Sequence, residues 1–261
     1  MFPMTSPTRT ALAAALAVAF ASDASAQHSA MPAGVTHEQH MEQMKKDADA
    51  MADQGYQQAG AHNPGGAQAD HFERHFNNAA DWVKTFEDPA RDAWQLPDRV
   101  IETLQLKRGQ IVADIGAGTG YFSTRLARSA TAPRVYAVDI ELSMVAHLTE
   151  RAKQEGLSNV TAVLGGSDRT HLPEAVDVVL VVDTFHHIPS RVAYFTALKA
   201  RMKREARLAI IDFRKGAPSG PPEEFRFTPD QITAELAKAG FSLQASHDFL
   251  PQQHFLVYGV K

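Results

Sequence analysis

The stretch VADIGAGTGY, residues 112–121, decides the fold, because an apolar run meets three closely spaced glycines there. The run predicts the end of a buried strand, and the residues after Gly120 predict the start of a helix. Glycines at such a junction let the backbone turn tightly and let a ligand approach the bare chain. The first amides of the helix then point at that ligand. A nicotinamide-type fingerprint needs a glycine at position 121, and Tyr121 stands there, which disfavours a nucleotide-dependent oxidoreductase.

A second strand end strengthens this interpretation. The segment RVYAVD, residues 134–139, predicts another strand, and Asp139 lies 19 residues beyond Gly120. A carboxylate at this point of an α/β fold can accept hydrogen bonds from both hydroxyls of a ribose. The alternative is that Asp139 only caps the end of its strand.

From residue 110 onward, short apolar segments alternate with amphipathic ones. This pattern predicts a doubly wound α/β fold with a mainly parallel, seven-stranded sheet. Two strands close together at the end predict an antiparallel C-terminal hairpin at the sheet edge. The motif TPDQ (residues 228–231) predicts a capped helix start, and Gly240 predicts the end of that helix. The predicted strands are 110–115, 134–139, 159–164, 176–182, 207–213, 241–250 and 254–260, and helices are predicted near 121–129, 142–155 and 189–203.

The segments VADIGAGTGYFSTRLA (112–127) and VYAVDIELSMV (135–145) together resemble the class I S-adenosylmethionine-dependent methyltransferase family. The resemblance covers roughly residues 72–261. It implies a Rossmann-like methyltransferase fold, S-adenosyl-L-methionine as cofactor and a small-molecule methyl acceptor. It also implies that the glycines pass beneath the methionine and ribose parts of the cofactor, while Asp114 braces their loop. The cofactor-binding residues implied in this way are Asp114, Gly116, Gly118, Gly120, Asp139, Ile140, Ser167 and Asp168.

The resemblance also implies roles for individual residues of this set. Asp139 would hold the ribose hydroxyls, and Ile140 would pack on the adenine face. Asp168, with Ser167 beside it, would meet the adenine amino group from the loop after the third strand. Here the sequence reads GGSDRTHLP (165–173) where the family more often has G-D-x-x-x-L-P, so the register can differ by a residue or two.

The fourth predicted strand ends in a polar cluster, DTFHHI (183–188). Ligands of open α/β sheets bind at the carboxyl ends of the strands. Asp183, His186 and His187 are therefore the candidate catalytic residues, for contact with the acceptor or removal of its proton. Histidine suits proton transfer near neutral pH. The alternative is that the two histidines cap the following helix and shape the pocket.

An aromatic segment precedes the first strand. Residues 71–105, named the lid here, contain Phe72, Phe76, Trp82 and Trp94 and predict short helices interrupted at two prolines. In many relatives such a segment closes over the cofactor. We expect Arg91 and Gln95 to face the site, and residues 71–261 to form one methyltransferase domain.

The N-terminus predicts export. Arg9, the apolar run 11–21 and the site Ala24-Ser25-Ala26 follow the order of a secretory signal peptide, residues 1–26. The run is too short to span a bilayer, which needs about 20 apolar residues. We expect an exported protein, most simply periplasmic, without a membrane span after cleavage. If this extension is not used, the protein would be cytoplasmic.

Residues 27–70 predict a flexible linker, because few of them could enter a core. The linker is rich in histidine and methionine, which are copper ligands, so copper binding is a hypothesis there beside the simpler interpretation as a solvated linker. Residues 27–75 hold seven acidic and three basic side chains, which accounts for the net charge of -4 of the whole chain.

The composition narrows the function classes. The chain has no cysteine, which excludes thiol nucleophiles and cysteine-ligated metals. A pI near 6.3 argues against nucleic acid as partner. We expect no metal in the catalytic site, and the oligomeric state and the acceptor stay open. The alternatives to a small-molecule methyltransferase are an exported S-adenosylmethionine-binding or copper-linked module without turnover, and a protein methyltransferase.

Overall fold

The computed structural model describes residues 71–261. The predicted signal peptide (1–26), the predicted linker (27–70) and the copper hypothesis lie outside the described residues. The elements in chain order are α2 (Ala79–Phe86), η1 (Pro89–Arg91), α3 (Asp92–Gln95), α4 (Pro97–Thr103), β1 (Ile111–Ile115), α5 (Tyr121–Arg128), β2 (Arg134–Asp139), α6 (Leu142–Gln154), β3 (Val160–Leu164), β4 (Val176–Val182), η2 (Phe185–His187), α7 (Arg191–Lys199), β5 (Met202–Phe213), η3 (Glu223–Phe225), α8 (Pro229–Lys238), β6 (Phe241–His247) and β7 (Gln253–Val260).

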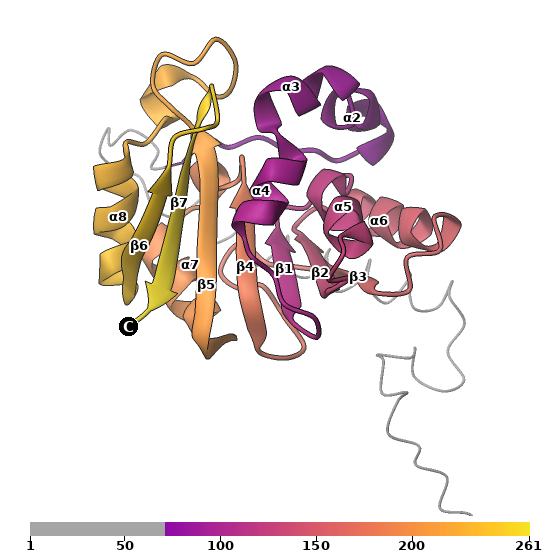
Figure 1. Cartoon of the computed structure of the whole chain (residues 1–261). Coiled ribbons are helices and arrows are strands. Elements are labelled where there is room, and N and C mark those ends of the chain that lie inside the picture. The colour runs from indigo at the N-terminus through magenta and orange to yellow at the C-terminus, as the bar shows by residue number, and fades with distance from the viewer. Residues whose placement is uncertain (1–70) are drawn as a thin grey trace, which may run out of the picture. The chain divides into compact units, whose positions relative to one another are not determined.

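The strands form one seven-stranded sheet in the order β3-β2-β1-β4-β5-β7-β6. Strands β1 to β5 are parallel, and β7 runs antiparallel to both β5 and β6. Figure 1 shows this order from β6 at the left edge to β3 at the right. The predicted doubly wound fold with an antiparallel C-terminal hairpin is confirmed.

The order of the strands reverses between β1 and β4. From β1 the chain proceeds outward to β2 and β3, and it then returns to place β4 on the other side of β1. The helices that follow β1 and β4, α5 and α7, therefore pack on opposite faces of the sheet. Open α/β sheets bind their ligands in the crevice at such a switch point.

Each face of the sheet has its own apolar core. Successive residues of a strand point to opposite faces. Ile111 and Ile115 of β1 belong to a core with side chains of α7 and α8, whereas Val112 belongs to a second core with side chains of α4 and α5. The three β1 residues are 3% exposed or less. Burial on both faces explains why β1 and β4 are almost wholly apolar in sequence.

Three predicted boundaries are wrong. The helix predicted near 189–203 ends at Lys199, and β5, predicted to begin at residue 207, begins at Met202. Met202 pairs with Val176 across a register shift, and the Lys203 ammonium lies 2.7 Å from the Asp177 carboxylate. These contacts with β4 extend the strand through a polar stretch that local pattern assigns to a loop. The strand predicted to reach residue 250 ends at His247.

The predicted start of α8 is confirmed. The Thr228 hydroxyl accepts a hydrogen bond from the Gln231 amide, and the Gln231 side chain accepts one from the Thr228 amide. Gly240 follows the helix with φ 88°, a conformation that favours glycine.

Within residues 71–261, the helices are all too short or too polar to cross a bilayer. In the same part of the chain, no group of three or more histidine, aspartate or glutamate side chains is arranged to hold a metal ion.

Candidate active site

The glycine loop after β1 packs directly against neighbouring elements. A Cβ on Gly116 (φ 73°) would lie 2.1 Å from the Thr184 hydroxyl oxygen, at the end of β4. A Cβ on Gly120 (φ 98°) would lie 2.8 Å from a Leu148 methyl of α6. Both positions therefore require glycine for space as well as for backbone conformation. The first contact brings the loops that follow β1 and β4 together at the switch point.

Asp114, the last polar residue of β1, lies beneath this loop. Its carboxylate accepts a 2.6 Å hydrogen bond from the Ser123 hydroxyl of α5. Burial raises the pKa of Asp114 to about 6, and the Ser123 bond acts against that rise. This bond joins the strand before the loop to the helix after it, so Asp114 lies where a brace for the loop would be.

Asp139 joins the same loop to β2. One oxygen accepts a hydrogen bond from the Gly118 amide at 2.8 Å, and the other accepts one from the Glu141 amide at 2.9 Å. The residue is 8% exposed, and burial raises its pKa to about 6. Each carboxylate oxygen can accept a further bond. Beside it, Ile140 is 57% exposed, which is unusual for a large apolar side chain.

The loop after β3 follows this edge. Leu164 pairs with Asp139, and the Gly165 amide donates to the Asp139 carbonyl oxygen at 2.8 Å. Ser167 and Asp168 are both exposed. The Asp168 carboxylate is engaged by the neighbouring Arg169 at 2.6 Å. Asp168 thus lies in the loop where the sequence predicts it, but its side chain pairs with an arginine of the same loop.

Asp183 lies at the end of β4, in a left-handed backbone conformation with φ 52°. Its carboxylate accepts a hydrogen bond from the Gln253 side chain of β7 and lies 3.5 Å from the Arg91 guanidinium. Burial raises the pKa of Asp183 to about 7, although Arg91 acts in the opposite direction. Strained polar residues of this kind concentrate at functional sites.

The two histidines that follow have different environments. His186 is 3% exposed, and its Nδ1 lies 2.8 Å from the Asp212 carboxylate of β5. Burial alone would lower the pKa of His186, but the Asp212 charge outweighs it and the pKa is raised. This pair fixes the orientation of the ring inside the domain and favours its protonated form.

His187 is held in one tautomer. Its Nδ1 lies 2.6 Å from the Phe72 carbonyl oxygen, which can only accept, so Nδ1 carries the proton. Burial lowers the pKa of His187 to about 4, and the nearby His186 adds to this effect. At neutral pH the ring is uncharged, and Nε2 has the lone pair of a base. Of the two histidines, His187 has the more favourable state for proton removal.

The lid crosses the carboxyl edge of the sheet. At the β4 side, the Phe72 amide donates to the His186 carbonyl oxygen at 2.7 Å. At the β2 side, the Phe76 amide donates to the Glu141 carboxylate at 3.0 Å. Between them, the Phe86 ring would lie 3.3 Å from a Cβ on Gly118. The lid thus covers the glycine loop and both of its neighbouring strand ends.

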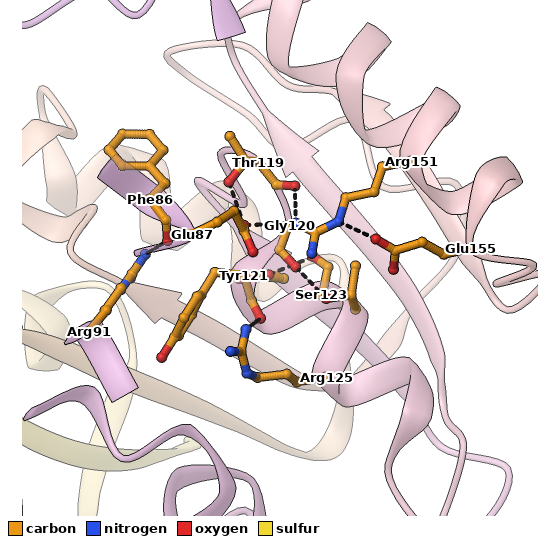
Figure 2. A network of polar contacts seen from close by, with 12 residues as sticks. Phe86, Glu87, Arg91, Thr119, Gly120, Tyr121, Ser123, Arg125, Arg151 and Glu155 are labelled. Carbon is orange, nitrogen blue, oxygen red and sulfur yellow. Dashed lines mark hydrogen bonds and ion pairs between the residues drawn. The ribbon is translucent and has the colours of Figure 1, made fainter. Parts of the chain in front are cut away.

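Figure 2 shows how the lid is attached to the glycine loop. The Glu87 carboxylate accepts a 2.6 Å hydrogen bond from the Thr119 hydroxyl and forms an ion pair of 2.7 Å with Arg151 of α6. Arg151 also donates to the Thr119 carbonyl oxygen at 2.8 Å. Arg91 and Gln95, the two lid residues expected to face the site, reach its β4 side.

Sequence reasoning missed Glu87 and Gln253. Glu87 is the C-cap of α2, where a carboxylate is unfavourable to the helix dipole, so a partner outside the helix could have been suspected. Gln253 starts β7 opposite Phe213, and only the antiparallel register of that pair brings it to Asp183. No local sequence signal would have found it.

The comparisons with known proteins agree with this geometry. Residues 112–205 match a family model described as methyltransferase domain. The crystal structure of a SAM-dependent methyltransferase from Aquifex aeolicus is similar, with a TM-score of 0.66 and 27% identity, over 70% of this chain and 99% of that chain. The described region has the Rossmann-like fold of the class I methyltransferases and contains a methyltransferase domain. Its cofactor is S-adenosylmethionine.

Two curated plant proteins are similar to part of the domain. One is (S)-coclaurine N-methyltransferase of Thalictrum flavum subsp. glaucum, 28% identical over 42% of this chain and 30% of that protein. The other is phosphoethanolamine N-methyltransferase 1 of Triticum aestivum, 29% identical over 48% of this chain and 25% of that protein. The chain thus spans less than a third of the length of these relatives.

The residues of the methyltransferase domain fit the cofactor. Gly116 and Gly118 have no side chains, Asp139 has free acceptor capacity, and Ile140 offers an exposed apolar face. These features suit a ligand that combines a ribose with a flat base.

Proposed function

We propose that this protein transfers a methyl group from S-adenosylmethionine to a small-molecule acceptor whose nucleophilic atom carries a proton. The observation that carries the proposal is the contact between Gly116 and Thr184. It places the cofactor loop next to the polar end of β4, where Asp183 and His187 lie. A cofactor-binding half and a proton-accepting half thereby share one edge of the sheet.

The cofactor-binding half is assigned from the resemblance to the methyltransferase family, and the contacts of the loop support it. Asp139 would hold the ribose hydroxyls, Ile140 would contact the base, and the loop from Gly116 to Gly120 would pass under the rest of the cofactor. Ser167 and Asp168 are the candidates for the adenine amino group. When bound, S-adenosylmethionine supplies a methyl group on a sulfonium, which is already activated for transfer. The protein therefore contributes mainly positioning, exclusion of water and proton transfer.

The proton-accepting half contains two groups of different strength. Nε2 of His187 is unprotonated at neutral pH, and the Phe72 carbonyl fixes the ring. Asp183 has a pKa of about 7, which makes it the better proton acceptor near neutrality. His186 is buried and held by Asp212 at 2.8 Å, and it would orient its neighbours.

We further propose that the acceptor atom is an amine nitrogen. The two plant relatives are named for N-methylation, of coclaurine and of phosphoethanolamine. An alkyl amine is protonated at neutral pH and must lose a proton before it can attack. Asp183 is a carboxylate with a pKa suited to taking that proton.

Binding of the cofactor is the first test. Calorimetry of the full chain should detect binding of S-adenosylmethionine and S-adenosylhomocysteine but no binding of NAD. Asp139→Ala should weaken both sulfur ligands about 100-fold, because two hydrogen bonds to a charged group are lost. Glu205→Gln, at an exposed site near the start of β5, is the control and should bind like wild type. Tight NAD binding without either sulfur ligand would overturn the proposal.

Transfer is the second test. Release of S-adenosylhomocysteine should be measured with a panel of primary and secondary amines, matched alcohols and a mixture of peptides. Turnover with amines alone supports the proposal. Turnover with alcohols alone contradicts the nitrogen assignment, and turnover with peptides alone favours a protein methyltransferase. Binding of the cofactor without turnover on any of them favours a binding module.

A further inference from the structure

Four side chains form a closed ring between the lid and the end of β4. The Arg91 guanidinium donates to the Gln95 side-chain oxygen at 3.2 Å, and the Gln95 amide donates to the Gln253 side-chain oxygen at 2.6 Å. The Gln253 amide then donates to Asp183, and the Asp183 carboxylate lies 3.5 Å from Arg91. Both glutamines are 0% exposed, so water does not compete for these bonds.

The ring has a fixed direction, which follows from its arginine. A guanidinium has donors only, so Gln95 must turn its oxygen toward Arg91 and its amide away. That amide requires the oxygen of Gln253, which leaves the Gln253 amide to donate to Asp183. The series of hydrogen bonds that starts at Arg91 therefore ends on Asp183, which acts as an acceptor. This arrangement favours the ionised carboxylate, because a protonated carboxyl would present a donor to a donor.

Burial acts against this state of Asp183. The side chain is 20% exposed, and loss of water around it favours protonation. The charged groups facing it are Arg91 from the lid, Asp212 from β5 and His186 from η2. Since Asp212 and His186 pair with each other at 2.8 Å, Arg91 is the main positive charge that opposes protonation.

Arg91 is also attached to the cofactor loop. Its guanidinium lies over the Tyr121 ring at 4.0 Å, and Arg125 lies over the same ring at 3.9 Å. Tyr121 donates its hydroxyl hydrogen bond to Asp92 of the lid. The Phe86 carbonyl oxygen accepts a further bond from Arg91 at 3.1 Å. The Arg91 guanidinium thus contacts both Tyr121, the first residue of α5, and the Asp183 carboxylate. Figure 2 shows its hydrogen bond to the Phe86 carbonyl oxygen of the lid.

We propose that Arg91 is a positioning residue that keeps Asp183 ionised through the Gln95–Gln253 ring, and only while the lid is closed on the cofactor loop. The role assigned to Asp183 rests on the proposed function, whereas the link between Arg91 and Asp183 does not. Closure of the lid and readiness of the proton acceptor become one event. An open lid takes away from Asp183 the Arg91 charge and the donor ring, the two features that favour its ionised form.

The direct test is a titration of Asp183 in the full chain without ligand. Carbon-13 NMR of labelled aspartate follows each carboxyl, with Asp183→Asn to assign the signal. Arg91→Met should move the midpoint of the Asp183 titration upward by about one pH unit or more, since an opposite charge nearby is lost. Arg91→Lys retains the charge without the ring of donors and should move it upward by less. Arg99→Met, which removes an arginine stacked at 4.2 Å on the Phe249 ring outside the site, should leave it unchanged.

A second readout links the ring to the lid. Hydrogen exchange should show faster exchange over residues 79–95 in Arg91→Met, and faster exchange to a smaller extent in Arg91→Lys. If Arg91→Met does not fold, Arg91→Lys alone decides through both readouts. An Asp183 midpoint that is the same in wild type and in the folded Arg91 variants overturns the inference.

These outcomes are separate from those of the proposed function. The Asp183 titration needs neither cofactor nor acceptor, so it can succeed in a chain that binds no S-adenosylmethionine. Conversely, the wild-type chain can transfer methyl groups while Arg91→Met leaves the Asp183 midpoint and the turnover unchanged. That result would support the proposed function and contradict the role of Arg91. Turnover of Arg91→Met at neutral pH should fall about five- to tenfold, because a shift of about one pH unit lowers the ionised fraction of Asp183 by that much, and the loss should be smaller at higher pH.

Discussion

At the scale of single residues, the glycines after β1 meet different demands. Gly116 makes room for Thr184 and Gly120 for Leu148, so both serve packing of the loop. Gly118 instead directs its amide to Asp139, and a Cβ there would meet only the edge of Phe86, at 3.3 Å. The spacing of these glycines therefore reflects three contacts with three elements, β4, the lid and α6.

His187 allows a sharp test at this scale. His187→Asn places an amide nitrogen near the position of Nδ1, so the hydrogen bond to the Phe72 carbonyl can persist, but the base is lost. Turnover should fall about 100-fold or more if His187 takes part in proton transfer. Affinity for S-adenosylhomocysteine, measured by calorimetry, should stay within about twofold of wild type. Equal turnover in the variant would leave His187 with a structural role.

The positions of site residues could be predicted best where a residue stands at the end of an apolar strand. Asp139 and Asp183 stand at such ends, so their place at the carboxyl edge could be inferred from periodicity. The protonation state of a site residue could not be inferred, because it depends on partners that are distant in sequence. His186 and His187 are adjacent in sequence, yet the Asp212 carboxylate raises the pKa of His186 whereas burial lowers that of His187.

At the scale of elements, α6 and the glycine loop hold the lid at the end of α2, through Glu87. Glu87→Gln should weaken this attachment, because the ion pair with Arg151 loses its charge while the bond to Thr119 can persist. We expect faster amide exchange over residues 79–95 and about fivefold weaker binding of S-adenosylhomocysteine, the effect of about 1 kcal/mol.

The chain offers a matched control for this change. Glu155 pairs with the same Arg151 at 2.8 Å but links α6 to Arg128 of α5 and does not touch the lid. Glu155→Gln should leave exchange over residues 79–95 as in wild type. Equal effects of the two variants would mean that Arg151 stabilises the domain in general and does not hold the lid in particular.

The elements themselves were largely predictable, with one instructive exception. Seven strands and the capped start of α8 follow from apolar runs and a capping motif, which are local signals. The early start of β5 does not, because KREA (203–206) reads as a polar turn and becomes strand only through pairing with β4. The lid was predictable as an aromatic segment, but its attachment by Glu87 depends on tertiary contacts.

At the scale of the whole molecule, the sequence predicts a secreted precursor. We propose export with cleavage before Gln27, as the site Ala24-Ser25-Ala26 indicates. Expression of the full chain in a bacterium should give a periplasmic protein whose N-terminal sequence begins at Gln27. Ala26→Leu should block cleavage and retain the precursor. A protein found only in the cytoplasm with residues 1–26 intact would contradict export.

Buried carboxyl groups also give the domain a pH-dependent stability. Burial raises the pKa of Asp114 and Asp139 to about 6 and that of Asp183 to about 7, whereas an unfolded aspartate titrates near 3.9. The folded state therefore binds more protons than the unfolded state. Their stabilising contribution is complete below pH ~4 and is lost as the pH rises through about 6 to 7.

The histidines decide in which interval this effect can be measured. The pKa of His187 is lowered to about 4, which opposes the carboxyl groups below pH ~6.5 but not above, where the ring is neutral in both states. The raised pKa of His186 acts in the same direction as the carboxyl groups. Between pH 6.5 and 8.5 the free energy of unfolding in urea should fall by about 1 kcal/mol, mostly through Asp183. Asp183→Asn should flatten this dependence, and a stability that stays flat over the interval in wild type would show that Asp183 is ionised well below pH 6.5.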